Sequence, residues 1–174
     1  MKKGLKWTLI SVSAFVLLII FGGMIFYFTQ INNAFISKPD IPKPEVDIAY
    51  LLANPGTQII FEEHIVYLSN EFGSYKIHES SGGDAVIVFY MVDIDTEVAL
   101  IQNYADSEVV DEIPDEYDLR ISGEQIVIAN LIESDNLGDD MKDSIDAGEI
   151  EIEIISDMGT LALKGYLGVY DELF

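Results

Sequence analysis

Residues 85–92 read AVIVFYMV, and every position of this run is apolar. A strand with one solvated face alternates apolar and polar residues, whereas a strand covered on both faces is apolar throughout. The run lies between SSGGD at residues 80–84 and DID at residues 93–95, and both flanking segments are typical of turns. Residues 85–92 are therefore predicted to form the central strand of a sheet.

Four further strands are predicted around this one. Residues 74–79 and 96–104 flank it in the chain, and a short strand at residues 117–121 follows an acidic loop at residues 106–116. Residues 149–154 read EIEIEI, a strict alternation in which the isoleucines face a core and the glutamates face water.

Helices are predicted before and after this group of strands. Two precede it, at residues 46–53 and 57–71, and the last covers residues 161–174. Between the fourth and fifth strands, SGEQ at residues 122–125 fits a capping box with Ser122 as N-cap, and a second short helix stops at Gly148. Because strands come first and helices cluster later, we expect an α+β fold, with a mostly antiparallel five-stranded sheet and about five helices.

An uncharged segment at residues 8–29 precedes this domain. Its 22 residues would span about 33 Å as a helix, enough to cross a bilayer core. A cleaved signal peptide is the alternative, but its apolar region is shorter and ends in small residues. Three prolines within residues 39–44 favour an extended spacer. The predicted organisation is a stub and transmembrane helix at 1–29, a tether at 30–44 and one domain at 45–174.

The lysines around the apolar segment favour one orientation. Lys2, Lys3 and Lys6 precede it, whereas Lys38 and Lys43 follow it. Because positive charge is retained on the cytoplasmic side, we expect the N-terminus in the cytoplasm and the domain outside. The chain is thus predicted to be a single-pass protein of the cell membrane with an extracytoplasmic domain.

Charge excludes some classes of partner. The formal net charge is −22, and from Glu45 onward there are 30 acidic and only four basic side chains. Such a field repels phosphate backbones, so no nucleic acid is expected as a partner. The acid keeps the domain soluble, although a calcium ion or a basic partner could also use it. The chain has no cysteine, which excludes disulfides, thiol catalysis and cysteine-bound metals.

Motifs for catalysis or metal binding are missing. The sequence has no nucleophile elbow, phosphate-binding loop or paired zinc histidines, so we expect no enzyme activity, cofactor or metal. His64 is expected on a helix surface and His78 on an exposed strand face. The carboxylates of residues 93–97 alternate and could approach a calcium ion, but a solvated turn is the favoured interpretation.

The second half of the chain resembles a known family. Residues 118–121 form the expected strand, SGEQ starts a helix at 122–125, a short helix ends at Gly148, and DMG at 157–159 opens the last helix. Together with the isoleucine-alternating strand, this order looks like a sterol carrier protein 2-type lipid-binding domain. The resemblance covers residues 45–174 in element order.

Some residues depart from that family's pattern. Glu149, Glu151 and Glu153 stand where the family often has lysines, and Ser156 stands where it often has glycine. The last three residues, ELF, are no peroxisomal signal. These departures argue against a peroxisomal shuttle and leave sterol specificity open.

The resemblance implies a hydrophobic tunnel between sheet and helices that holds a lipid, a fatty acid or a similar apolar ligand. Seven apolar side chains are its predicted wall: Phe89, Met91, Leu131, Ile132, Leu163, Leu167 and Tyr170. The expected function is non-catalytic binding of such a ligand next to the membrane. The alternative is a membrane-anchored extracytoplasmic interaction domain or accessory subunit with a solid core and no ligand.

Overall fold

The computed structural model describes residues 37–80 and 83–169. Contacts divide the chain into two compact units, residues 1–36 and residues 37–174, and all described residues belong to the second. The predicted transmembrane helix at residues 8–29 therefore lies outside the described residues. In the described part of the chain, no helix has the length and apolarity needed to cross a bilayer. Residues 37–47 form neither helix nor strand.

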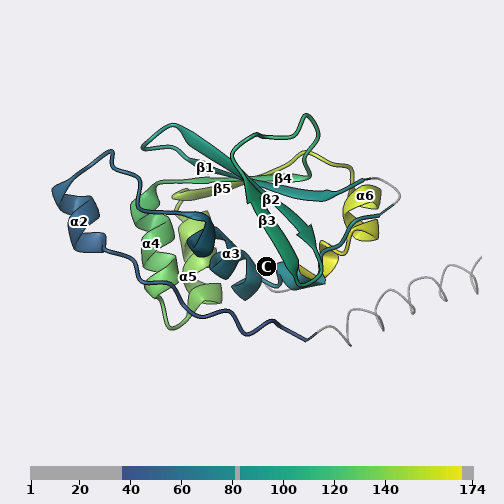
Figure 1. The fold of residues 1–174 in the computed structure, drawn as a ribbon, viewed down its shortest axis with the longest axis horizontal. Coiled ribbons are helices and arrows are strands. Elements are labelled where there is room, and N and C mark those ends of the chain that lie inside the picture. Colours follow the sequence, from purple (N-terminus) through teal and green to yellow (C-terminus); the bar gives the residue numbers. More distant parts are fainter. Residues whose placement is uncertain (1–36, 81–82, 170–174) are drawn as a thin grey trace, which may run out of the picture. The chain divides into compact units, whose positions relative to one another are not determined.

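The second unit is built on one five-stranded sheet (Figure 1). Its strands are β1 (Ala85–Met91), β2 (Thr96–Asn103), β3 (Asp106–Val110), β4 (Leu119–Gly123) and β5 (Ile150–Ile154). Their spatial order is β3-β2-β1-β4-β5, so β1 lies at the centre. The β1–β4 pair is parallel and the other three pairs are antiparallel. The prediction of a mostly antiparallel, five-stranded sheet is confirmed.

Strand β1 is buried on both faces, as its apolar sequence predicts. Ile87 and Phe89 belong to the large core on the helical side of the sheet. Val86 and Val88 belong to a smaller cluster on the other side, where Ile113 and Tyr117 pack against it. The second face is therefore covered by the loop between β3 and β4.

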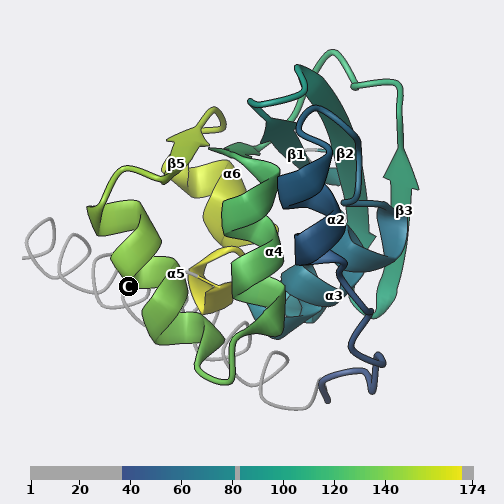
Figure 2. The same ribbon diagram turned by 90° about the vertical axis from the view of Figure 1, so that its left-hand side faces the viewer.

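The helices pack against one face of the sheet, as Figures 1 and 2 show. The described part of the chain contains five α-helices and one short 3₁₀ helix with complete bounds, and residues 167–169 are also helical. The helices with complete bounds are α2 (Ile48–Ala53), α3 (Glu62–Glu71), η1 (Ser74–Lys76), α4 (Gln125–Glu133), α5 (Leu137–Asp146) and α6 (Met158–Leu163). Helix α5 ends at Asp146 with Ala147 as its C-cap, and the helix stops before Gly148, which has a φ of 74°, as predicted. The mixed α+β class is confirmed.

One predicted strand and part of one predicted loop are wrong. Residues 74–79 form the 3₁₀ helix η1 and an irregular segment, because Gly73 adopts a left-handed conformation directly after α3 and turns the chain. Residues 106–110, predicted as loop, form strand β3 at the edge of the sheet. Tyr104, with a φ of 55°, lies in the tight turn that folds β3 back onto β2.

The start of α4 also differs from the prediction. Strand β4 continues through Ser122 to Gly123, and Glu124 is the N-cap residue. The side chain that accepts the first helical N–H comes from the β1–β2 turn, because Asp93 Oδ1 lies 3.0 Å from Gln125 N. A long-range contact thus replaces the local capping box.

Candidate functional site

An apolar pocket of about 290 Å³ lies between the sheet and the elements α3, η1 and α6. Nearly all of the side chains that line it are hydrocarbon or aromatic. The lining residues are Ser69, Phe72, Ser74, Ile87, Phe89, Leu119, Ile121, Ile152, Ile154, Met158, Leu161, Tyr166, Leu167 and Val169. We call this cavity the apolar pocket.

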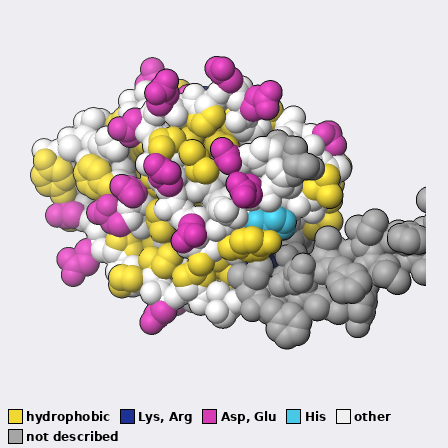
Figure 3. All heavy atoms as spheres, turned by 45° about the vertical axis from the view of Figure 1, so that its right-hand side comes forward, with side chains coloured by type: hydrophobic (Ala, Val, Ile, Leu, Met, Phe, Trp, Pro, Cys, Tyr) yellow, Lys and Arg dark blue, Asp and Glu magenta, His cyan; other side chains and the backbone are white. Residues whose placement is uncertain are grey.

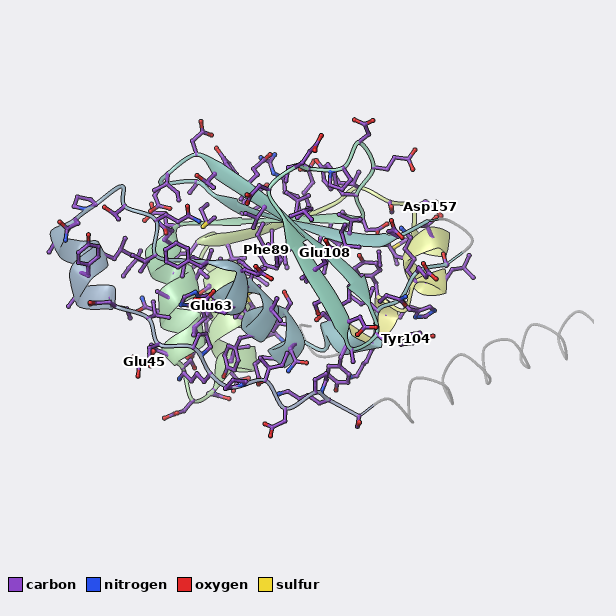
Figure 4. All side chains as sticks on the ribbon, in the orientation of Figure 1. Glu45, Glu63, Phe89, Tyr104, Glu108 and Asp157 are labelled. Atoms are coloured by element: carbon purple, nitrogen blue, oxygen red, sulfur yellow. The ribbon has the colours of Figure 1, made fainter. Side chains whose placement is uncertain are left out.

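The sheet supplies one wall of the apolar pocket. Strand residues two apart point to the same face, so β1, β4 and β5 each contribute two alternate residues. Phe89, on β1, lies between the sheet and the helices in Figure 4. The isoleucines of EIEIEI face this side as predicted: Ile150 is buried in the core, and Ile152 and Ile154 line the pocket.

The chain from α6 onward supplies the opposite wall. Asp157 caps α6: its Oδ2 accepts from the Thr160 hydroxyl at 2.8 Å and its Oδ1 from Gly159 N at 2.8 Å. The Thr160 hydroxyl, followed by backbone N–H groups, lowers the pKa of the Asp157 carboxyl. Beyond the helix, Tyr166, Leu167 and Val169 join Leu161 on the pocket. These four residues are called the C-terminal wall.

The predicted helix at residues 161–174 is interrupted in its described part: residues 161–163 and 167–169 are helical, and residues 164–166 form a turn. Helix α6 ends at Leu163, and Gly165 follows with a φ of 89°. The chain passes close to another segment there, since a Cβ on Gly165 would lie 2.6 Å from the Lys76 carbonyl oxygen. A left-handed glycine turn therefore replaces the continuous helix.

A buried ionic cluster attaches the C-terminal wall to the sheet. Lys164 Nζ lies 2.8 Å from Asp118 Oδ1 and 2.9 Å from Oδ2, and it donates to the Asp84 carbonyl at 2.5 Å. Asp118 also accepts from Val86 N at 2.9 Å and from the Ser156 hydroxyl at 2.7 Å. Both members of this ion pair thus have several partners, as a buried charge requires.

Tyr166 connects this cluster to the apolar pocket. It lines the pocket, and its hydroxyl donates to Asp118 Oδ2 at 3.0 Å. Burial, followed by the negative charge of Asp118, raises the pKa of the Tyr166 hydroxyl far above its usual value. The hydroxyl therefore stays protonated and serves as a hydrogen-bond donor to Asp118.

The mouth of the apolar pocket is hydrophobic. Ile154, Met158 and Leu167 line the pocket and are also exposed to solvent. Ile155 and Leu163, close to them in the chain, are exposed as well. Figure 3, which brings the right-hand side of Figure 1 forward, shows hydrophobic side chains interspersed with acidic ones.

The structure distributes the seven predicted wall residues over different places. Phe89 and Leu167 line the apolar pocket. Met91 and Ile132 are fully buried in the core away from the lining, and Leu163 is 56% exposed because α6 turns it outward. Leu131 lines a different groove, and Tyr170 lies outside the described residues.

That second groove, of about 840 Å³, lies beside α4, α5 and the start of β5. Its lining includes the five carboxylates of Glu124, Asp140, Asp143, Glu149 and Glu151. An apolar ligand would gain little there, because the walls prefer contact with water. Within residues 37–80 and 83–169, no three His, Asp or Glu side chains are grouped as a metal site requires.

The two histidines differ from their predicted settings. His64 is buried, not on the surface, because its ring caps α3: Nδ1 lies 3.1 Å from Phe61 N, and Nε2 lies 3.1 Å from the Glu45 carbonyl oxygen. His78 is half-buried outside any strand, and its ring stacks on Tyr104 with centroids 4.7 Å apart. Neither lines the apolar pocket.

The sequence reasoning missed Ser69, Asp118, Lys164 and Tyr166 as site residues. A signal for one of them exists, because Lys164 is a lone cation in the apolar segment 161–170, in a domain with four basic residues. Its partner lies 46 residues earlier, and no local pattern indicates that distance.

The sequence matches no protein-family model and no curated protein. Among solved structures it is similar to the UbiJ-SCP2 ubiquinone synthesis protein, at 12% identity and a TM-score of 0.39, over 88% of this chain and 99% of that one. It is also similar to the inverting sec-alkylsulfatase Pisa1 from Pseudomonas sp., at 13% identity and a TM-score of 0.34, over 52% of this chain and 13% of that one.

Proposed function

We propose that the domain binds an apolar ligand in the apolar pocket, without covalent chemistry, while the N-terminal segment holds it at a membrane. The observation that supports ligand binding best is the pocket itself. It is a cavity of about 290 Å³ that lies between sheet and helices and opens through an apolar mouth. Protein interiors are normally close-packed, and most voids in them are no larger than a water molecule.

The residues that line the pocket explain how a ligand would be held there and why we assign no catalytic step. Burying about 200 Å² of ligand surface contributes roughly 5 kcal/mol at 25 cal/mol per Å², before the cost of association. In the described part of the chain, no histidine, carboxylate or lysine lines the pocket, and the Tyr166 hydroxyl donates its hydrogen bond to Asp118. We therefore assign binding and no catalytic step to this site.

Membrane tethering is the second part of the proposal. It is supported by the uncharged residues 8–29, the proline-bearing spacer and the lysines before the apolar segment. A domain attached in this way, outside the cell, would exchange apolar molecules with the nearby bilayer. A reporter fused to the C-terminus tests the orientation, because external protease should remove it from intact cells.

Native mass spectrometry of residues 37–174 tests ligand binding. This unit contains the entire sheet and its core, which is what a domain needs to fold alone. We expect apolar molecules to co-purify with it or to bind when added. In Leu161→Trp, the larger side chain should fill the pocket and abolish binding.

Leu163→Trp is the matched control, because Leu163 lies on the same helix but is exposed and does not line the pocket. It should leave binding unchanged. A purely unliganded wild-type mass, with no uptake of any added apolar molecule, would contradict the proposal. The domain would then be an interaction domain without a ligand.

A further inference from the structure

We propose that the apolar pocket selects an uncharged ligand about the size of two fused aromatic rings, with one oxygen that hydrogen-bonds to Ser69. This inference rests on the proposed function, since it names the class of ligand for the same pocket. Ser69 lies on α3 and lines the pocket with an exposed fraction of only 3%.

The Ser69 hydroxyl has an unused hydrogen-bonding capacity. Its Oγ is buried and has no hydrogen-bond partner among the described residues. Buried polar groups in proteins almost always have a partner, so an orphaned hydroxyl at a cavity needs an explanation. Because Ser69 borders the pocket, rotation about its Cα–Cβ bond can turn the hydroxyl toward the cavity, where an oxygen on the ligand would satisfy it.

The charges of the domain determine which oxygen-bearing groups a ligand in the apolar pocket can carry. Among residues 37–80 and 83–169, no charged side chain lines the pocket. Lys164 lies two residues before the lining residue Tyr166, but its ammonium is already bound to both Asp118 oxygens and to the Asp84 carbonyl. An ionised carboxylate would therefore lose its hydration without gaining a cation, and the formal net charge of −22 would repel it from the mouth. An alcohol, phenol or ketone carries no charge, so it neither needs a cation in the pocket nor is repelled by the acidic domain.

Volume limits the size of the ligand. An apolar cavity of about 150 Å³ holds one benzene molecule. The pocket, at about 290 Å³, has nearly twice that volume. Ser69 is a buried part of the lining, whereas Met158 and Leu167 are exposed at the mouth. The oxygen of the ligand should therefore point inward and its hydrocarbon part toward the mouth.

Three naphthalene compounds test this class of ligand by fluorescence titration of residues 37–174 at pH 7. Naphthalene supplies the hydrocarbon alone, 2-naphthol adds a neutral hydroxyl, and 2-naphthoate adds an ionised carboxylate. We expect 2-naphthol to bind at least tenfold more tightly than 2-naphthoate. In Ser69→Ala, 2-naphthol should lose about threefold to tenfold in affinity, and naphthalene should bind as before.

Ser107→Ala is the control, because it removes the hydroxyl of a half-buried serine on β3 that does not line the pocket. Its ratio of 2-naphthol to naphthalene affinity should stay at the wild-type value. Equal binding of 2-naphthoate and 2-naphthol would overturn the uncharged class, and an unchanged ratio in Ser69→Ala would overturn the role of Ser69. Either of these two results would leave the proposed binding of an apolar ligand intact. If none of the three compounds binds, both the proposed ligand class and the proposed binding function are contradicted.

Discussion

The Lys164 ammonium lies within 2.9 Å of both carboxylate oxygens of Asp118, and the two side chains are only 5% and 1% exposed. Asp118 immediately precedes β4, and Lys164 follows α6. The pair therefore attaches the C-terminal wall of the apolar pocket to the middle of the sheet. It differs from an ordinary surface ion pair because neither charge has water as an alternative partner.

Lys164→Met should destabilise the domain by about 3–5 kcal/mol, because it leaves the Asp118 charge buried without its cation. Urea unfolding of residues 37–174 measures this difference. Lys38→Met is the control: Lys38 lies 2.6 Å from Glu71, but these side chains are 43% and 26% exposed. An exposed pair of this kind contributes less than about 1 kcal/mol. If the two variants lose the same free energy of unfolding, burial of the Asp118–Lys164 pair does not increase its contribution to stability.

The elements that the sequence predicts well are those whose pattern follows directly from burial. The apolar run at 85–92 has no polar position because β1 has cores on both faces. The alternation at 149–154 reflects a strand with one face toward the core and the pocket. Period-two patterns of this kind need no knowledge of distant residues.

The elements that the sequence does not predict depend on contacts far along the chain. Asp93 replaces the expected local cap of α4, and Gly165 ends a helix whose residue pattern could continue. This turn leaves Leu163 exposed and places Tyr166 on the pocket wall. Of the six predicted wall residues that the structure describes, two line the pocket, because the sequence indicates which residues are apolar but not which of them border a void.

Gly165→Ala should destabilise the domain more than Gly148→Ala. Both glycines have positive φ, 89° and 74°, so alanine costs about 1–2 kcal/mol at either position. A Cβ at Gly148 meets nothing within 4 Å, whereas one at Gly165 would lie 2.6 Å from the Lys76 carbonyl oxygen. The difference between the two variants in urea unfolding isolates this clash. Equal destabilisation would mean that the two segments separate at little cost.

Gln125→Ala should cost about 1–3 kcal/mol, because this fully buried amide joins three segments. Its Oε1 accepts from Ile59 N at 2.8 Å, and its Nε2 donates to Thr57 O at 3.1 Å and to Asp93 Oδ2 at 3.2 Å. The variant leaves the buried Ile59 N–H without its partner and removes the two half-buried hydrogen bonds to Thr57 and Asp93. Thermal unfolding of residues 37–174 measures the effect. Gln58→Ala is the control, since that exposed side chain makes one hydrogen bond, to the Ile60 carbonyl; a similar loss there would contradict the argument.

Tyr166→Phe should change how stability depends on alkaline pH. The pKa of the Tyr166 hydroxyl is raised in the folded state, by burial first and by Asp118 second. The stabilisation linked to this shift is therefore fully present below pH 10, where tyrosine in the unfolded chain is also protonated. Above about pH 10 the unfolded chain loses that proton and the folded domain does not, so wild-type stability falls.

Tyr166→Phe has no hydroxyl proton to lose and cannot donate the hydrogen bond to Asp118 Oδ2. At pH 8 this variant should therefore be less stable than the wild type. Between pH 8 and pH 11 the difference in unfolding free energy between wild type and variant should shrink by about 1.4 kcal/mol. This value corresponds to the one pH unit between the pKa of tyrosine in the unfolded chain, about 10, and pH 11. Urea unfolding of both proteins at the two pH values measures it, and all other ionising groups cancel in the comparison. A difference that stays constant would mean that the Tyr166 hydroxyl ionises as easily in the folded domain as in the unfolded chain, which its contact with a buried carboxylate should prevent.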